Sequence, residues 1–509
     1  MRSSNGPSAA DSGASSTPTN PSLRNAVFAI VVAIQFVLVT VNGSTTMVLP
    51  AIRDGFDASN SALQWYASLF ALGFAATLVI AGRLGDLFGT RRILLIGYAA
   101  LVASWILSIA APNIWFLLVA RLLQGIAGGV TSPQLSAMIQ RTFSGHARTR
   151  AFAVFLVFAG GGFMVGQLGS GLLTNIDLWG AGWRWAYLPY IPMGIITWLL
   201  AVKIVPHTKP GTAGRLDLVG AAALSVVAFL LMFPLIQGRK AGWPVWIFVM
   251  LACAIPAFIA FIRYERRLVR AGGDPLVNPI LFAIRTFRYG NIITLLVGLL
   301  AAAAPLYLIL TIQLGFDRDP LQAALLTCPM PFANMFGSLM SAPLMRRFGR
   351  AAIGIGAALT ILAAVAVLIA VHLELGNVIA DQPIFFVPGI MLLGLALGIS
   401  IACSIAFVLA EVPHANAGSA SGVQATVLQL SGAVGIAVYG VAFYAAISPT
   451  DAIEEYLDGI RWVMWMTIAL TAVQFVILRF IPKRSAATAD EYVLSDPELL
   501  VIPDLHGGD

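Results

Sequence analysis

The sequence is a succession of apolar stretches, each long enough to cross a lipid bilayer as a helix. The apolar core of a bilayer is about 30 Å thick, and roughly 20 consecutive apolar residues span it in helical form. A helix also satisfies its own backbone hydrogen bonds, which lipid cannot do. Hydropathy places these spans near residues 26–50, 61–82, 92–111, 114–138, 150–174, 183–203, 216–237, 243–263, 289–313, 321–345, 350–372, 384–411, 417–447 and 460–481. The sequence therefore predicts an all-α polytopic membrane protein with 14 transmembrane helices.

Charged residues are scarce and lie mostly between these stretches. They make up 10% of the 509 residues, against roughly 25% in an ordinary soluble domain. In a soluble protein the net charge of +7 could indicate a nucleic-acid partner, but here the placement of basic loops explains it, so no nucleic acid is expected. The three cysteines lie in apolar runs and the five histidines lack metal-ligand spacing, so no metal or other cofactor is expected.

The distribution of lysine and arginine sets the orientation of the chain. With both termini in the cytoplasm, 23 of the 30 basic residues fall in cytoplasmic segments, six fall outside, and Arg121 lies within a span. Cytoplasmic loops of membrane proteins carry such an excess of basic residues. We therefore expect a multi-pass protein of the plasma membrane with both ends in the cytoplasm.

The chain contains an internal repeat that divides it into two groups of spans. Gly82 to Arg92 reads G-R-L-G-D-L-F-G-T-R-R and Ser341 to Arg350 reads S-A-P-L-M-R-R-F-G-R, with their Phe-Gly pairs 260 residues apart. Two similar bundles with a substrate site between them are a transporter architecture. The predicted segments are a disordered cytoplasmic tail (1–25), an N-terminal six-helix bundle (26–203), an inserted two-helix hairpin with linkers (204–288), a C-terminal six-helix bundle (289–481) and a cytoplasmic acidic tail (482–509).

Several motifs resemble those of the major facilitator superfamily, and within it the 14-span drug:proton antiporters of the EmrB/QacA type. The matching stretches are Gly82 to Arg92, Arg121-Leu-Leu-Gln-Gly125, Trp183-Arg-Trp185, Leu216-Asp217-Leu-Val-Gly220 and Gly418-Ser-Ala-Ser-Gly422. The resemblance covers about residues 25–482. It implies a secondary transporter that exports hydrophobic or amphipathic small molecules by alternating access, coupled to protons. It also implies that Gly82, Asp86, Gly89, Arg91 and Arg92 form a cytoplasmic gate, with Asp86 capping a helix of the other bundle.

Arg121 is the cation that lies well inside a span, where a charge is costly unless it is paired or hydrated. Gln124 follows it by three residues and faces the same way on a helix, so the two can share a polar site. The arginine serves either proton coupling or contact with an anion, or it is satisfied by carbonyl groups and glutamines of the bundle.

The residues expected to couple transport to protons depart from the pattern of the antiporters. Val41 stands where an aspartate is usual in the first span, and Gln167 replaces a proline in the fifth. No carboxylate lies deep in any predicted span. Either coupling therefore runs through groups at the edges of the spans (Asp86, Glu411 or Asp177), or the carrier is weakly coupled or uncoupled.

Polar but uncharged side chains are scattered through the spans and form the candidate substrate cavity. They are Gln35, Asn42, Tyr66, Gln134, Gln167, Asn291, Gln313, Asn334, Gln424 and Gln429. A wide apolar cavity with a few hydrogen-bonding groups suits bulky amphipathic molecules. Each of these amides must find a partner in the bundle or face water, so a structural role is the alternative for any one of them.

Other functions remain as alternatives. A carrier of a specific natural product or lipid, without tight proton coupling, would share this architecture. A membrane enzyme would need a catalytic constellation within the spans, and a sensor would need a sizeable soluble domain; the sequence displays neither, so we expect no enzyme. The expected partners are a small amphipathic substrate, protons and membrane lipids, and the expected state is a monomer.

Overall fold

The computed structural model describes residues 21–143, 145–176, 182–207, 217–273, 275–277, 279–375, 382–412, 417–447 and 453–480, which contain helices and no strand. The first half of the chain forms α1 (Pro21–Met47), α2 (Leu49–Phe56), α3 (Asn60–Phe88), α4 (Thr90–Ile109), α5 (Ile114–Thr142), α6 (Gly145–Ile176), η2 (Gly182–Ala186) and α7 (Tyr190–Ile204). The inserted pair is α8 (Leu218–Ala241) and α9 (Val245–Arg270). The second half forms η3 (Pro279–Ala283), α10 (Arg285–Leu310), η4 (Thr311–Gly315), α11 (Pro320–Thr327), α12 (Pro329–Phe348), α13 (Ala351–Leu375), η5 (Pro383–Phe386), α14 (Val387–Leu409), α15 (Ala417–Ala445) and α16 (Ile453–Leu478).

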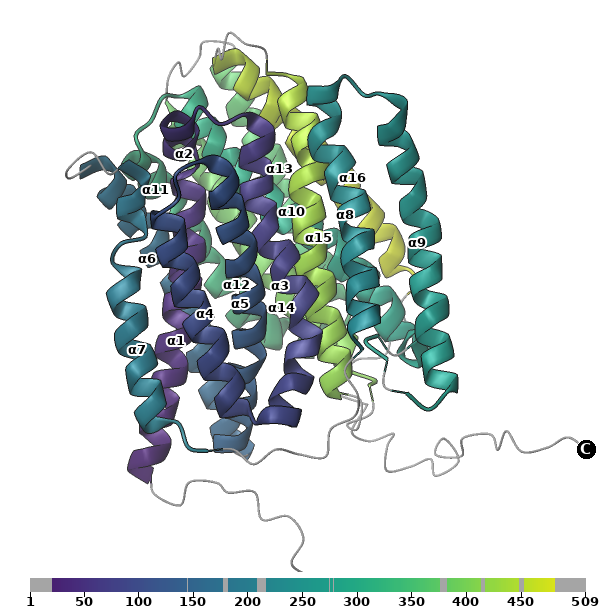
Figure 1. The fold of residues 1–509 in the computed structure, drawn as a ribbon. Helices are drawn as coiled ribbons and strands as arrows, with labels where there is room; N and C mark the ends of the chain where they lie inside the picture. The colour runs from purple at the N-terminus through teal and green to yellow at the C-terminus, as the bar shows by residue number, and fades with distance from the viewer. Residues whose placement is uncertain are drawn as a thin grey trace, which may run out of the picture.

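The long helices run side by side as an upright bundle, as the spans predict (Figure 1). Among the described residues, 13 segments are long and apolar enough to cross a membrane. Helix α3, with 29 residues, is a further long helix and packs along α5 and α15 inside the same bundle. The fold is therefore that of an all-α polytopic membrane protein, as predicted. The predicted tails, 1–25 and 482–509, lie almost wholly outside the described residues.

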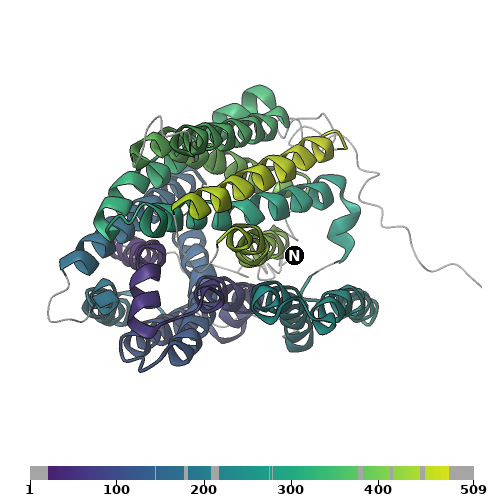
Figure 2. The same ribbon diagram turned by 90° about the horizontal axis from the view of Figure 1, so that it is seen from above.

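The two halves of the chain lie on opposite sides of the bundle (Figure 2). They meet along α3 and α15, and again where α6 packs against α11 and α12. The repeat recognised in the sequence has a structural counterpart, because both Phe-Gly pairs end a long helix with a glycine at positive φ. Gly89 has a φ of 89° between α3 and α4, and Gly349 has a φ of 53° after α12.

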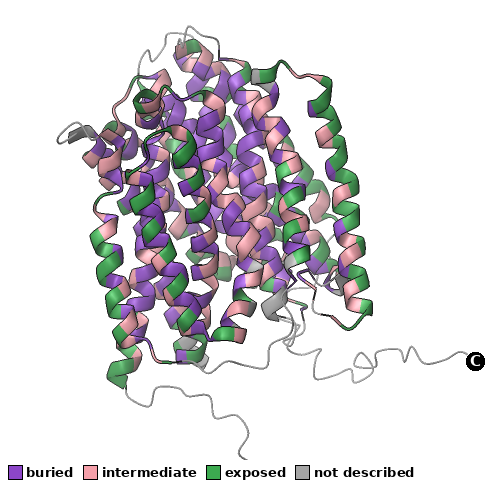
Figure 3. Cartoon of the chain, viewed as in Figure 1, coloured by how far each residue is buried: buried purple, intermediate pink, exposed green. Residues whose placement is uncertain are grey.

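Small residues bring the helices of each half into backbone contact. Gly162 and Gly166 on α6 face the backbone carbonyls of Phe36 and Thr40 on α1, so that a Cβ at either glycine would overlap them. The sequence spacing of Gly162, Gly166 and Ser170 places all three on one helix face. Burial follows the same plan, with buried residues concentrated in the centre of the bundle and exposed ones on outer helices such as α7 and α9 (Figure 3).

The inserted pair lies at one edge of the bundle, where α8 contacts both halves (Figures 1 and 2). Trp65 on α3 stacks on Phe229 of α8, with ring centroids 6.3 Å apart. On the other side α8 packs against α15. Helix α9 forms the outer wall and presents apolar residues such as Ile255, which is 65% exposed, towards the surroundings. The pair therefore covers the line along which the two halves meet.

Replacing Gly89 by alanine tests the helix break at the α3–α4 junction. A Cβ is poorly tolerated at a φ of 89°, so Gly89→Ala should lower the free energy of unfolding by at least about 1 kcal/mol. Gly82→Ala is the control, because Gly82 is helical and a Cβ there would meet no atom within 4 Å. Thermal unfolding in detergent measures the stability of the two purified variants. Equal effects of the two substitutions would contradict this account.

Candidate functional site

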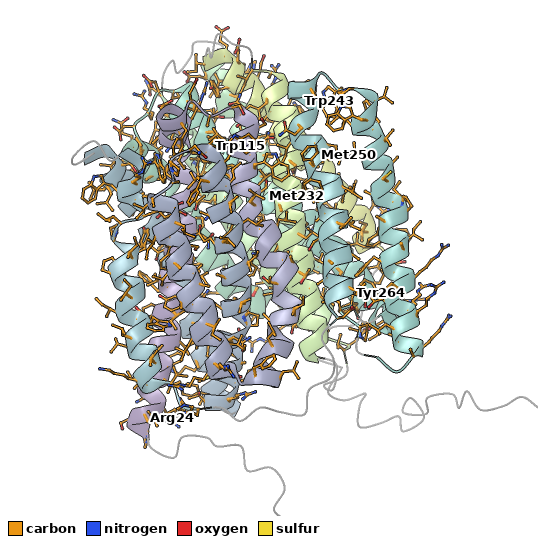
Figure 4. The ribbon with its side chains drawn as sticks, in the orientation of Figure 1. Arg24, Trp115, Met232, Trp243, Met250 and Tyr264 are labelled. Atoms are coloured by element: carbon orange, nitrogen blue, oxygen red, sulfur yellow. The ribbon has the colours of Figure 1, made fainter. Side chains whose placement is uncertain are left out.

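The end of the bundle at which α1 begins and the α3–α4 junction lies carries many of the basic side chains, and we call it the basic end; the other is the far end. Figure 4 places Arg24 and Tyr264 near the basic end, and Trp115 and Trp243 towards the far end. At the basic end the Arg91 guanidinium donates to the Val202 carbonyl and to Nε2 of His207, each at 2.6 Å. Arg91 therefore holds the α3–α4 junction to the end of α7, within the N-terminal half.

The other predicted gate residues surround this junction. Gly82 is exposed in the last part of α3, Gly89 is buried at the helix break, and Arg92 is exposed. The side chain of Asp86 lies outside what the structure describes, so its capping role stays a prediction.

Gln134, predicted for the cavity, lies close to this region: its Nε2 donates to the Ala81 carbonyl at 2.6 Å, which ties α5 to α3.

Arg121 occupies a fully enclosed site between α3 and α5. Its side chain is 3% exposed, and its NH1 donates to Oε1 of Gln124 at 2.8 Å, as the spacing predicts. The guanidinium carbon lies 5.2 Å from the ring centre of Tyr66 and 4.7 Å from that of Phe70. The Tyr66 hydroxyl in turn bonds to the Tyr187 hydroxyl. The cation thus rests on two aromatic faces and one amide.

The charge of Arg121 is not neutralised within this site. In the part of the chain that the structure describes, no carboxylate oxygen lies within salt-bridge distance of it, and its Nε has no hydrogen-bond partner. Aromatic faces attract a guanidinium, but they do not cancel its charge. Glu411, which the sequence suggests as a coupling residue together with Arg121, lies elsewhere: it follows α14 at the basic end and accepts a hydrogen bond from Thr286 at 2.8 Å. Arg121 is therefore a buried cation without a described counter-ion.

Many of the predicted cavity residues carry buried polar atoms without a hydrogen-bond partner among the described residues. These atoms are Oε1 of Gln35, Gln167 and Gln313, Oδ1 of Asn291 and Nε2 of Gln424. They come from α1, α6, the α10–η4 segment and α15, that is, from both halves of the chain. Asn42 donates to the Leu38 carbonyl of its own helix at 3.0 Å, and Asn334 and Gln429 are half-buried on α12 and α15. Buried amides of this kind are suited to binding polar groups of a ligand.

The two halves are in contact at the far end. Gln313 Nε2 donates to the Met47 carbonyl at 3.2 Å, which joins η4 to the end of α1. Met47 also packs with Ile309 and Ala324, and Leu168 of α6 lies against them, so an apolar cluster joins the two halves at this end. Arg53 donates to the Tyr456 hydroxyl at 3.4 Å across the same interface.

Sequence reasoning missed some of the polar contacts that organise this region. Ser44 bonds to the Tyr190 hydroxyl at 2.6 Å and to the Gly166 carbonyl at 3.1 Å, which links α1, α6 and α7. Gln64 of α3 lies against Gly440 of α15 next to the Tyr307 hydroxyl. Gln64, a glutamine within a span and two residues from Tyr66, could have been recognised from the sequence as a polar contact residue. Nothing in the sequence distinguished the short hydroxyl side chain of Ser44.

The structure also buries three carboxylates that the sequence left at the edges of spans, among them Asp217, which directly precedes α8 and is 6% exposed. Glu374, near the end of α13, is 6% exposed. Glu265 was expected in the linker after 263, but α9 continues to Arg270 and the Glu265 side chain is 0% exposed. The described residues contain no group of three or more histidine, cysteine, aspartate or glutamate side chains that could hold a metal.

Two helical bundles that meet along α3 and α15, with buried amides in both, are the architecture of a secondary transporter. Residues 31–436 match the Major Facilitator Superfamily, and the chain belongs to this superfamily. It is a multi-pass membrane transporter for small molecules and not an enzyme.

Relatives of the chain include named exporters of antibiotics and drugs. The chain is 33% identical over 411 residues to the "Probable actinorhodin transporter" of Streptomyces coelicolor, covering 81% of this chain and 70% of that protein. It is 29% identical to the cephamycin export protein of Amycolatopsis lactamdurans, over 92% of this chain and 97% of the relative. It is 27% identical to a multidrug efflux pump of Mycolicibacterium smegmatis, over 91% and 92% of the two chains.

Solved structures share the fold. A crystal structure of a POT family transporter matches with a TM-score of 0.65 and 15% identity, over 94% of this chain and 100% of that one. A D-xylose–proton symporter matches with a TM-score of 0.63 and 14% identity, over 91% and 99%. At this level of identity the similarity concerns the architecture alone.

Replacing Arg121 by lysine tests the aromatic site. Lysine keeps the charge but cannot lay a planar guanidinium on two rings while also reaching Gln124. Arg121→Lys should therefore lower the free energy of unfolding by about 1 kcal/mol. Arg461→Lys is the matched control, because Arg461 is 45% exposed in a surface pair with Asp458 and its replacement should change stability by less than about 0.5 kcal/mol. Thermal unfolding in detergent compares the stabilities of the two variants. If Arg121→Lys is as stable as the unmodified protein, the stabilising role of the aromatic site is refuted.

Proposed function

We propose that this protein exports hydrophobic or amphipathic small molecules across the plasma membrane by alternating access, as an antibiotic or multidrug efflux transporter. The observation that carries the proposal is the set of buried amides without hydrogen-bond partners among the described residues, contributed by both halves of a bundle whose halves touch at the far end. The superfamily membership and the relatives named as antibiotic and drug exporters support it.

We assign the basic end to the cytoplasm. Arg24, Arg91, Arg92, Arg346 and Arg347 all belong to it, and cytoplasmic segments of membrane proteins are enriched in such residues. The far end then faces outwards, and the contacts of Met47, Gln313 and Arg53 close the protein on that side. A transporter closed to the outside is in the state that receives its substrate from the cytoplasm or the inner leaflet.

The substrate class follows from the lining of the proposed cavity. Amides such as Gln35, Gln167 and Gln424 offer hydrogen bonds without charge, while neighbouring side chains on these helices are apolar. Such a site binds bulky molecules with a few polar groups. Arg121 adds a positive potential, which favours negatively charged substrates and the deprotonated form of nearby acidic groups.

We further propose that export is driven by the proton gradient and that the protein acts as a monomer. Proton antiport requires a group that titrates as the access changes. Asp86, Glu411 and Asp177 are the candidates from the sequence, and Glu411 is an exposed carboxylate at the basic end. The charge of Arg121 raises the free energy of a second cation in the bundle. This repulsion would help to prevent a proton and the substrate from being bound at the same time.

Transport by protein reconstituted in vesicles tests the function and its energy source together. An imposed pH gradient should accelerate export of an amphipathic dye at least tenfold, and a protonophore should remove the acceleration. Export that proceeds equally with and without the gradient would rule out proton antiport. Transport confined to a single natural product or lipid in a panel of compounds would replace the multidrug assignment.

Replacing Asp86 by asparagine tests the proposed gate. Asparagine keeps the size of the side chain but removes the charge that would cap a helix of the other half, so Asp86→Asn should lower export by at least tenfold. Asp54→Asn is the control, since Asp54 is exposed on α2 at the far end. Membrane expression of both variants should equal that of the unmodified protein. Normal export by Asp86→Asn would remove this residue from the gate.

A further inference from the structure

Two acidic side chains meet at the basic end of the inserted pair, apart from the cavity described above. Asp217 directly precedes α8 and is 6% exposed, and Glu265 lies near the end of α9 and is 0% exposed. Both face Gly220: a Cβ at this glycine would overlap Oδ2 of Asp217 and Oε1 of Glu265. The two carboxyl groups are therefore neighbours, although 48 residues separate them in the sequence.

Most of the oxygens in this site are occupied by donors from the protein. Oδ1 of Asp217 accepts the Gly220 N–H at 2.7 Å and the Tyr264 hydroxyl at 2.9 Å. Oδ2 of Asp217 accepts the Leu276 N–H at 3.2 Å, and Oε2 of Glu265 accepts the Val277 N–H at 3.2 Å. Oε1 of Glu265 has no donor among the described residues, although it is fully buried. The oxygen without a donor is thus the one on the side of the Asp217 carboxyl group.

We propose that Asp217 and Glu265 bind one proton between Oδ2 and Oε1, and that this proton holds the linker after α9 against the inserted pair. Two ionised carboxylates this close together and out of contact with water would repel one another strongly, whereas a single shared proton gives the unpartnered oxygen its hydrogen bond. The pair then carries one negative charge, which the two backbone N–H groups of the linker and the Tyr264 hydroxyl stabilise.

Among the residues that the structure describes, no cation takes the place of the proton. On α9, Arg263, Arg266, Arg267 and Arg270 are all exposed, and Tyr264 is the titratable side chain that reaches the pair. Arg285 and Arg288 of α10 and Glu411 after α14 are also exposed. Ile80 of α3 and Val423 of α15, which pack near the site, are apolar. With two carboxylates among its described residues, the site also falls short of the usual ligand set for a metal.

The location of the pair connects it to both halves of the transporter. The linker that it binds, residues 275–277, leads through η3 into α10, the first long helix of the C-terminal half. Leu276 and Val277 pack in one cluster with Phe287 of α10 and Val408 of α14, and Ile80 of α3 lies against this cluster. Loss of the proton leaves two buried charges that must gain water, so the linker should loosen from this cluster.

The position of the inserted pair suggests a role for the shared proton in transport, and this role rests on the proposed function. The inserted pair lies across the line where α3 and α15 meet, and these helices belong to different halves. A proton-dependent hold on the linker would therefore make the relative movement of the halves depend on the cytoplasmic pH. Proton binding itself does not depend on that function and is tested separately.

Infrared spectroscopy of the purified protein tests the shared proton directly. The unmodified protein should show a C=O stretching band of one protonated carboxyl group at neutral pH, and this band should disappear as the pH rises. Glu265→Gln and Asp217→Asn should each abolish the band, whereas Glu411→Gln should leave it unchanged. A band that survives in both pair variants, or its absence from the unmodified protein at neutral pH, would overturn the proposal.

Stability as a function of pH provides a second measurement. A proton bound in the folded state but not in the unfolded chain stabilises the fold, and this stabilisation is lost as pH rises. Between the ordinary glutamate pKa of about 4.3 and the pH at which the band disappears, the folding constant of the unmodified protein should fall by about tenfold per pH unit relative to Glu265→Gln. The glutamine can donate to Asp217 at any pH, so its stability should lack this component. Parallel pH profiles of the two proteins would contradict the proposal.

Export assays separate this proposal from the proposed function. If the unmodified protein exports a dye, Glu265→Gln should flatten the dependence of its export rate on cytoplasmic pH. If the unmodified protein exports none of the compounds offered, the export function fails while the infrared and stability results still decide whether the carboxyl pair binds a proton. An export rate with the same pH dependence in both proteins would remove the pair from the control of transport.

Discussion

Polar groups buried among these helices must find their partners within the protein, because lipid supplies none. Arg121 is held by Gln124 and by the faces of Tyr66 and Phe70, and no described carboxylate neutralises it. Tyr66 in turn bonds to Tyr187, so α3, α5 and the segment before α7 are positioned around one cation. The same requirement explains the Ser44 contacts that join α1, α6 and α7. The N-terminal half is therefore organised by a small number of polar contacts in an apolar bundle.

Close packing of small residues makes these contacts possible in both halves. Gly166 lies on the Thr40 carbonyl in the N-terminal half, and Gly435 lies on the Leu299 carbonyl in the C-terminal half. Helices that approach this closely move as rigid groups, because a shift of either backbone breaks many van der Waals contacts at once. In the proposed transport cycle the movement would then be confined to the line between the halves, where Gln313 and Arg53 make their contacts. The inserted pair covers part of that line and is placed to influence the movement.

Hydropathy was enough to predict an all-α membrane protein with many spans, since each span depends on residues close together in the chain. The division into two six-helix bundles and an inserted pair stays a prediction. The pairing of Arg121 with Gln124 was also predictable, because three residues of helix bring the side chains together. The role of Gln134 was not, because its partner is the Ala81 carbonyl on another helix. The position of Asp86 relative to the other half stays a prediction.

The sequence by itself determined that this protein is a transporter built from transmembrane helices. The lengths of its apolar stretches and its local motifs depend only on residues close together in the chain. Only the tertiary structure decided which polar groups of different helices meet. Gln313 reaches the Met47 carbonyl from 266 residues away, and Glu265 faces Asp217 through the packing of α8 on α9. The physical reason is that a helix specifies its own hydrogen bonds, whereas its neighbours are chosen by the shapes of side chains contributed from the whole bundle.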